Sequence, residues 1–165
     1  MKNLIALSTN IKSKLSYASQ EAWLWSRTVQ ENIVFFSEYD EEKYNQIIHS
    51  CCLSPDFEQF ANADQTDVGQ SGFNFSGGQK QRINVARCAY RDADIYLMDD
   101  PLSALDPKVQ TDIFDRLLSN ENGFLSDKVA KCFSYIQTAY YLTNYYKIKF
   151  KKSLGIKVLS DLRMI

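Results

Sequence analysis

The chain has 165 residues, of which 45% are hydrophobic and 24% charged, and its formal net charge is -1. This composition is typical of a globular protein, and the length suits one domain better than two. The balanced charge excludes a generally basic nucleic-acid binder, so we expect no nucleic-acid partner. One histidine, His49, is too few for chemistry that needs several imidazoles. No run approaches the ~20 apolar residues of a membrane span, and the apolar start is too short for a signal peptide.

The four cysteines do not have the spacing of a zinc site. Cys51 and Cys52 are adjacent, Cys88 and Cys132 stand apart, and His49 lies beside the first pair. The sequence contains no C-x-x-C pair, which is the commonest element of a zinc-binding pattern. We therefore expect reduced, mostly packed thiols, as in a cytosolic setting.

The small net charge hides two unlike segments. Residues 1–127 hold 11 basic and 19 acidic side chains, a balance of -8. Residues 128–165 hold 8 basic side chains and one acidic side chain, a balance of +7, together with five of the ten tyrosines. A shift of this size marks a boundary. We expect one domain over residues 1–127, followed by a basic, tyrosine-rich tail over residues 128–165.

The first elements of the expected domain are a strand, a helix and a loop. Residues 14–19 favour a short strand. Residues 41–52 favour a helix, because their apolar side chains recur at helical spacing. The apolar face of this helix consists of Tyr44, Ile47, Ile48 and Cys51. Residues 57–75 are largely polar with two glycines and predict a loop.

The following elements are a helix, a strand and another helix. Residues 77–90 predict a helix, with Ile83, Ala86 and Tyr90 along one face. Residues 95–98 are a short, continuous apolar run, which favours a strand buried on both faces. Pro107 begins a third helix at a position that needs no backbone donor. Its apolar positions are Val109, Ile113 and Leu117. Strands that alternate with helices predict an α/β fold with a mainly parallel sheet.

A serine and two glycines open the helix predicted at residues 77–90. Ser76 can cap this helix, and Ser76 together with Gln79 matches a capping box. Gly77 and Gly78 leave backbone N–H groups open to an oxygen-rich ligand. Because a helix N-terminus carries partial positive charge, the motif favours a phosphate site over the alternative of a plain helix cap.

Two carboxylates follow the strand predicted at residues 95–98. Asp99 and Asp100 emerge at its carboxyl end, where ligands of open α/β sheets bind, and one of them is well placed to hold Mg²⁺. A solvated acidic turn is the alternative. The helix and the returning strand bring both motifs near one edge of the sheet, and both motifs indicate a nucleotide phosphate.

Four segments strongly resemble motifs of ABC transporter ATP-binding domains. Residues 74–82, NFSGGQKQR, resemble the signature motif. Residues 93–106, ADIYLMDDPLSALD, resemble the Walker B strand and the D-loop. Residues 17–24, YASQEAWL, resemble the Q-loop, and residues 28–33, TVQENI, the segment after it.

The likeness covers residues 16–127 and is strongest to the first nucleotide-binding domain of subfamily C, the multidrug-resistance-associated type. It implies a P-loop NTPase fold of the ABC type, with a mainly parallel sheet and a helical subdomain that carries the signature motif. It also implies ATP and Mg²⁺ as cofactors. In the family two such domains pair head to tail, so the resemblance implies a second nucleotide-binding domain and transmembrane domains as partners.

The resemblance assigns the contact with ATP to the signature motif. In the family, the signature motif of one domain closes over the γ-phosphate of ATP held by the other domain. The residues that match it here are Ser76, Gly77, Gly78 and Gln79. The D-loop, from Ser103 to Asp106, is implied in the contact between the two domains.

The resemblance also assigns metal and catalytic roles. Asp99 is implied in holding Mg²⁺, and Gln20 in contacting the metal at the surface that meets the transmembrane domains. Asp100 occupies the position where fully active members have a glutamate that polarises the attacking water. Aspartate is one methylene shorter, and a misplacement of ~1 Å can cost about a hundredfold in rate. We therefore expect a slow site.

Two features of the family pattern are missing. A nucleotide cradle G-x-x-x-x-G-K-[ST], the Walker A segment, should precede Gln20, yet the first glycine is Gly69. The family also has a histidine near residues 129–136, where this sequence has none. We expect a partial gene product, begun late and read past Asp127 in another frame or into an intron. The alternative is a functional tail whose lysines and tyrosines bind an anionic membrane surface.

Three functions are compatible with these residues. The favoured one is the ATP-binding and ATPase portion of an ABC-type exporter, at the cytoplasmic face of a membrane and inactive alone. The second is a non-catalytic module that pairs with an intact ABC ATPase domain. The third is a soluble ABC ATPase of DNA repair or translation, which the lack of heptad insertions and of a phosphate loop disfavours.

Overall fold

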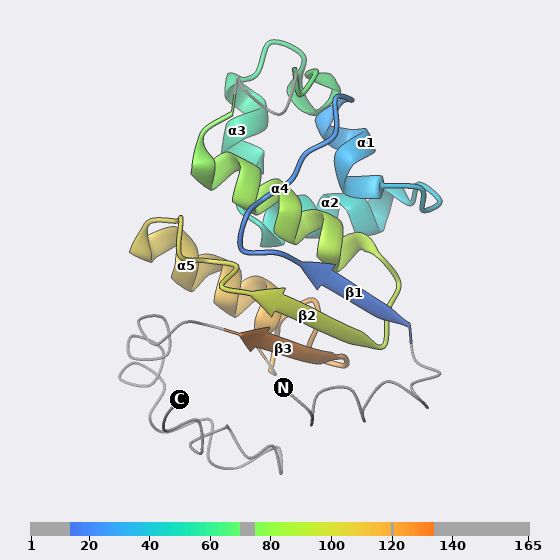
Figure 1. The fold of residues 1–165 in the computed structure, drawn as a ribbon, viewed down its shortest axis with the longest axis vertical. Coiled ribbons are helices and arrows are strands. Elements are labelled where there is room, and N and C mark those ends of the chain that lie inside the picture. Colours follow the sequence, from blue (N-terminus) through green and yellow to red (C-terminus); the bar gives the residue numbers. More distant parts are fainter. Residues whose placement is uncertain (1–13, 70–74, 120, 134–165) are drawn as a thin grey trace, which may run out of the picture. The chain divides into compact units, whose positions relative to one another are not determined.

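A computed structural model describes residues 14–69, 75–119 and 121–133 of the chain (Figure 1). All of these residues fall within one of two contact units, Met1–Ser134. Of the tail predicted at residues 128–165, the part from residue 134 onward lies outside the described residues. Among the helices of the described part, none is both long and apolar enough to cross a membrane.

Three parallel strands form the sheet of this unit. Both β1 (Leu15–Ala18) and β3 (Val129–Phe133) pair with β2 (Ile95–Asp99), which is therefore the central strand. The strands predicted at residues 14–19 and 95–98 are confirmed, and so is the α/β class with a parallel sheet. The sheet continues past Asp127, and the position of the domain boundary stays a prediction.

One face of the sheet is more deeply buried than the other. Tyr96 and Met98 of β2 are buried, as are Ser16 and Ala18 beside them on β1. The other side chains of β2 are half-buried, and on β1 Leu15 and Tyr17 are exposed. The expectation that β2 is buried on both faces is therefore wrong in part, because a helix covers only one face closely among the described residues.

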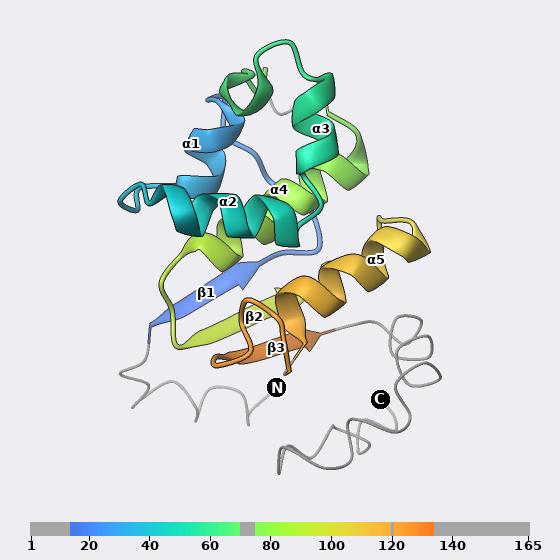
Figure 2. The same ribbon diagram turned by 180° about the vertical axis from the view of Figure 1, so that it is seen from behind.

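That helix is α4 (Gly77–Tyr90), which has the predicted bounds. It lies between the sheet and the helices α1 (Val29–Val34) and α2 (Glu41–Ser50) in both views (Figures 1 and 2). The hydroxyl of Ser16 donates a hydrogen bond to the Cys88 carbonyl at 2.8 Å, which joins β1 to α4. The predicted apolar face of α4 is buried, and it consists of Ile83, Ala86 and Tyr90.

The other two predicted helices are also present. α2 ends two residues before the predicted bound, and its predicted apolar residues Tyr44, Ile47, Ile48 and Cys51 are all buried. α5 (Pro107–Ile113) begins at the predicted proline and continues into a π-helical turn, η4 (Phe114–Leu118). Ile113 and Leu117 are buried. α5 lies beside β2 in both views (Figures 1 and 2).

Part of the predicted loop at residues 57–75 is helical. α3 (Ser54–Gln59) extends into it, and the 3₁₀-helix η2 (Ala63–Gln65) follows. Both elements are too short for an apolar period to show in the sequence. Packing stabilises them instead, because Phe57 and Phe60 lie against the core.

Candidate functional site

The capping box predicted from the sequence is present at the N-terminus of α4. Ser76 Oγ accepts a hydrogen bond from the Gln79 N–H at 3.2 Å, and Gln79 Oε1 accepts one from the Ser76 N–H at 2.9 Å. The N–H groups of Gly77 and Gly78 have no intrahelical acceptor, because a helix leaves its first donors unpaired. This helix end can therefore bind an anion through backbone N–H groups.

The two glycines of the signature motif differ in their surroundings. A Cβ atom at Gly77 would meet nothing within 4 Å, so this position is open. A Cβ atom at Gly78 would lie 3.4 Å from Leu105 Cδ2 and 3.5 Å from the Ala104 carbonyl oxygen. The first turn of α4 thus packs against the D-loop, and the structure brings the signature motif and the D-loop together.

The carboxyl end of β2 brings together four of the predicted site residues. Asp100 is 7% exposed and has a φ of 46°, in the left-handed region, where the chain turns after the strand. Gln20 Nε2 lies 3.5 Å from Asp100 Oδ2, and Ser103 Oγ donates to the Asp100 carbonyl at 3.2 Å. Asp99, the last residue of β2, is half-buried. Aspartate adopts this backbone conformation more readily than most non-glycine residues.

These residues fit a magnesium ion that arrives with phosphate ligands. Mg²⁺ is commonly bound by one or two carboxylates together with substrate phosphates and water. Asp99 and Asp100 supply two carboxylates, and the Gln20 amide lies beside Asp100. In the part of the chain that the structure describes, no group of three or more His, Cys, Asp or Glu residues could hold a metal. The fit is thus to a nucleotide-borne ion and not to a metal site of the chain alone.

Asp106 has a structural role in addition to the predicted one. Its Oδ1 accepts hydrogen bonds from the N–H groups of Lys108 and Val109, at 3.2 and 3.1 Å, so that it caps α5. The side chain is exposed. Contact of Asp106 with a second domain stays a prediction.

Sequence reasoning missed a buried asparagine, Asn32, and a half-buried arginine, Arg87, that fix the segment after Gln20. The Arg87 guanidinium donates to the Asn32 carbonyl, to Asn32 Oδ1 and to the Trp23 carbonyl, each at 2.7 Å. Asn32 is fully buried, and its Nδ2 donates to the Trp25 carbonyl at 2.9 Å. Burial lowers the pKa of Arg87 to about 10, so it stays charged at neutral pH. This Asn32–Arg87 cluster joins the post-Gln20 segment to α1 and α4.

A second missed residue is Asp56 of α3. It is 7% exposed, and its two carboxylate oxygens bind different partners. Oδ2 pairs with Arg82 Nη2 at 2.6 Å, and Oδ1 accepts from Gln79 Nε2 at 3.0 Å. Asp56 lies between the helix predicted at residues 41–52 and the loop predicted at residues 57–75, in a segment to which the sequence assigned no element, so nothing indicated this role.

Aromatic side chains are exposed next to the Gln20 segment. Trp23 is 56% exposed, Trp25 36% and Phe36 83%. Ring centroids of Trp25 and Phe36 are 5.4 Å apart. Trp25 and Phe36 also line a groove of about 300 Å³. The full set of lining residues is Trp25, Arg27, Gln30, Glu31, Val34, Phe35, Phe36 and Tyr39. Exposed aromatic clusters of this kind are typical of protein-binding surfaces.

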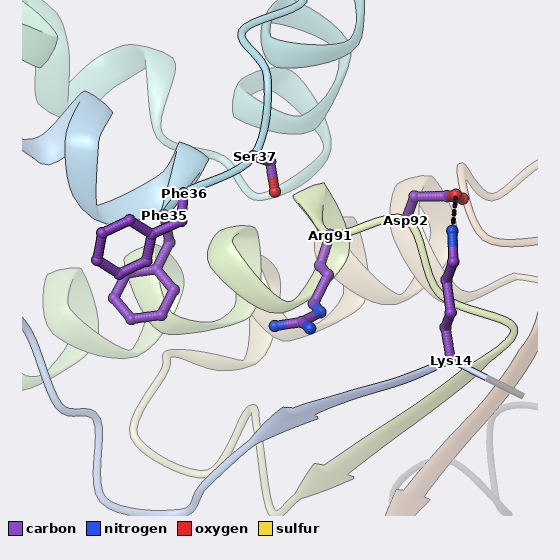
Figure 3. Close-up of a pocket in the computed structure, with 6 residues that line it drawn as sticks. All are labelled: Lys14, Phe35, Phe36, Ser37, Arg91 and Asp92. Atoms are coloured by element: carbon purple, nitrogen blue, oxygen red, sulfur yellow. Dashed lines mark hydrogen bonds and ion pairs between the residues drawn. The ribbon is translucent and has the colours of Figure 1, made fainter.

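A neighbouring cavity of about 320 Å³ contains none of the predicted site residues (Figure 3). The residues that line it are Lys14, Phe35, Phe36, Ser37, Arg91 and Asp92. Lys14 Nζ pairs with Asp92 Oδ2 at 3.2 Å across its edge, as Figure 3 shows. The cavity is thus separate from the signature motif and from the carboxyl end of β2.

Comparison with known proteins agrees with the motifs. Residues 4–103 match the family described as ABC transporter. ATP-binding cassette sub-family C member 2 of Mus musculus is 48% identical over 118 residues, which are 72% of this chain and 8% of that protein. The vacuolar heme ABC transmembrane exporter abc3 of Schizosaccharomyces pombe is 52% identical over 111 residues, 67% of this chain and 8% of that protein. The chain spans less than a tenth of the length of these two relatives.

Proposed function

Since this chain belongs to the ABC transporter family, within subfamily C, we propose that it is the part of an exporter that couples ATP binding and hydrolysis to transport. The observation that carries this proposal is the open N-terminus of α4. There the capping box holds Ser76 and Gln79 in place, and the position of Gly77 has free space around it. A phosphate group can approach this turn without meeting a side chain.

We propose that the phosphate belongs to ATP bound by a second ABC domain. The chain contains no G-x-x-x-x-G-K-[ST] segment, whose backbone and lysine hold phosphates in this family of folds. The signature motif and the D-loop are nevertheless packed as one surface. This combination also favours the second candidate function, a non-catalytic module that offers its signature motif to a partner without binding ATP.

At the carboxyl end of β2, Asp99 is the proposed ligand of the nucleotide's Mg²⁺, directly or through water, and Gln20 is proposed to contact the ion. When bound, the ion neutralises charge on the phosphates and orients them. Asp100 is proposed to orient the attacking water in a site that a phosphate cradle completes. Its burial and its contact with Gln20 support a fixed position for this carboxylate.

The proposed second partner is the transmembrane part of the exporter. Trp23 and Trp25 lie shortly after Gln20 in the chain, Phe36 lies against Trp25, and these large apolar side chains are exposed. Covering them removes apolar surface from water, which favours association. Through this contact the chain is proposed to lie at the cytoplasmic face of a membrane.

The proposal is tested by association with an ABC ATP-binding domain of subfamily C that has an intact phosphate-binding loop. We expect this chain to bind that domain in Mg-ATP and not in Mg-ADP, because the signature motif contacts the γ-phosphate. Analytical ultracentrifugation measures the complex. Equal association in the two nucleotides contradicts the proposal, and tight Mg-ATP binding by this chain alone contradicts the non-catalytic candidate.

Removing the cap of α4 or the cap of α1 distinguishes an effect on stability from an effect on nucleotide contact. Thr28 and Glu31 form a second capping box, at α1. We expect Ser76→Ala and Thr28→Ala each to lower the free energy of unfolding by about 1 kcal/mol, because each leaves one backbone donor unpaired. Urea denaturation measures this loss. Only Ser76→Ala is expected to weaken the Mg-ATP-dependent association, and equal weakening by both variants argues against a contact at Ser76.

A further inference from the structure

Helix α3 packs against the signature motif from two sides. On the apolar side, Phe60 lies against Phe75, the residue that precedes Ser76, with ring centroids 5.2 Å apart and an interplanar angle of 81°. On the polar side, Asp56 contacts Gln79 and Arg82, both on the first two turns of α4. α3 therefore holds the chain on both sides of the phosphate-facing turn.

The two carboxylate oxygens of Asp56 accept hydrogen bonds from two different side chains. A carboxylate and a guanidinium commonly form two parallel hydrogen bonds. Here Asp56 gives only Oδ2 to Arg82, at 2.6 Å, while Arg82 Nε is buried and has no hydrogen-bond partner among the described residues. The other oxygen, Oδ1, accepts the bond from Gln79 Nε2 at 3.0 Å. The carboxylate therefore makes one hydrogen bond to Arg82, through Oδ2, and uses Oδ1 to fix the side chain of Gln79.

The Gln79 side chain is fixed at both of its polar atoms as a result. Its Nε2 donates to Asp56, and its Oε1 accepts from the Ser76 N–H at 2.9 Å. A chain of hydrogen bonds therefore extends from the buried carboxylate of α3 to the backbone of Ser76. It orients the Gln79 amide so that the oxygen faces Ser76, which is the orientation the capping box needs.

We infer that Asp56 is a positioning residue for the signature motif, which it holds in its phosphate-binding form through the side chain of Gln79. This inference rests on the proposed function. Asp56 itself does not reach the phosphate. Its effect on nucleotide contact passes through Gln79, whereas its effect on stability passes mainly through Arg82, whose buried charge it pairs.

The two paths are separated by a double-mutant cycle of Asp56→Asn and Gln79→Ala, measured both as Mg-ATP-dependent association and as the urea midpoint. We expect Asp56→Asn to weaken association about tenfold, as the loss of one hydrogen bond allows. In the Gln79→Ala background, Asp56→Asn should change association by less than about twofold, because the hydrogen bonds from Asp56 through Gln79 to Ser76 are already lost. The urea midpoint should fall in both backgrounds, since Arg82 loses its partner in each.

Glu58→Gln is the matched control, because Glu58 is an exposed carboxylate on the same helix. It should leave association and midpoint unchanged. Asp56→Glu keeps the charge that Arg82 needs, so it protects folding, but it displaces both oxygens. It should weaken association as Asp56→Asn does, with a smaller loss of midpoint, and this variant decides the question if Asp56→Asn does not fold.

Normal association of either Asp56 variant overturns the inference, and so does a full tenfold effect in the Gln79→Ala background. In both cases the wild-type chain still associates in Mg-ATP, so the proposed function survives. A wild-type chain that shows no Mg-ATP-dependent association overturns the proposed function and the inference together.

Discussion

Replacement of Arg87 by alanine is expected to lower the free energy of unfolding by about 3 kcal/mol, because hydrogen bonds from a charged group to partly buried neutral acceptors are lost. The substitution removes three hydrogen bonds of 2.7 Å and leaves the buried Asn32 side chain with one fewer donor. It also removes the guanidinium from beside the rings of Trp23 and Phe35, whose centroids lie 5.2 and 5.1 Å from it. Both losses act on the segment that follows Gln20.

Urea unfolding followed by tryptophan fluorescence measures the effect, because Trp23 and Trp25 both lie at this cluster. Arg91→Ala is the control, since Arg91 is an exposed arginine that directly follows the same helix. It should change stability by less than about 0.5 kcal/mol. Arg87→Lys should be almost as unstable as Arg87→Ala, because a lysine ammonium group cannot make the three hydrogen bonds of the planar guanidinium. Equal midpoints for the Arg87 and Arg91 variants contradict the assignment.

The second large effect is expected at Gly77, on binding and not on stability. Gly77→Asp adds a carboxylate where the surroundings are open, at the first position of α4. The fold should be retained or slightly stabilised, because an acidic side chain in the first turn is favourable and the unfolded chain becomes less flexible. Two unit charges about 5 Å apart near a protein surface repel by about 3 kcal/mol. We therefore expect Mg-ATP-dependent association to weaken about a hundredfold.

Gly77→Ala is the matched neutral variant, which adds a methyl group without charge. Its association should stay much closer to that of the wild type than the association of Gly77→Asp does. The difference between the two variants should shrink as salt is added, since the aspartate lies at the surface and ions screen its charge. If Gly77→Asp associates as well as Gly77→Ala, the N-terminus of α4 does not meet a phosphate.

The sequence predicts those helices and strands that are determined by residues close together in the chain. α4 has a capping box, an apolar period and a polar end, all within residues 76–94. β1 and β2 are apolar and bounded by polar residues. The proximity of Gln20 to Asp100 follows from the rule that parallel strands end at one edge of a sheet. The same rule, together with the resemblance of four segments to ABC transporter motifs, supplied the candidate site.

What the sequence does not predict depends on contacts between distant residues. Asp56 and Gln79 lie 23 residues apart, and Asn32 and Arg87 lie 55 apart, so no local period joins either pair. α1 and α3 have six residues each, fewer than two turns, and need the rest of the fold to form. The burial of β2 depends on which helices cover each face, and a strand's own sequence does not report this. The functional roles stay predictions that the experiments above test.

The packing of Gly78 against the D-loop has a consequence for how a signal can travel through this chain. The space beside Gly78 would hold a methyl group and little more. The first turn of α4 therefore cannot move away from Ala104 and Leu105 without opening a gap. From the D-loop, the hydrogen bond of Ser103 to the Asp100 carbonyl continues the connection to the end of β2. We expect a ligand that displaces the first turn of α4 to displace the D-loop as well. Under the proposed function this coupling is reciprocal, so we expect a substitution at Asp100 that shifts the D-loop to change the affinity of the signature motif for its ligand.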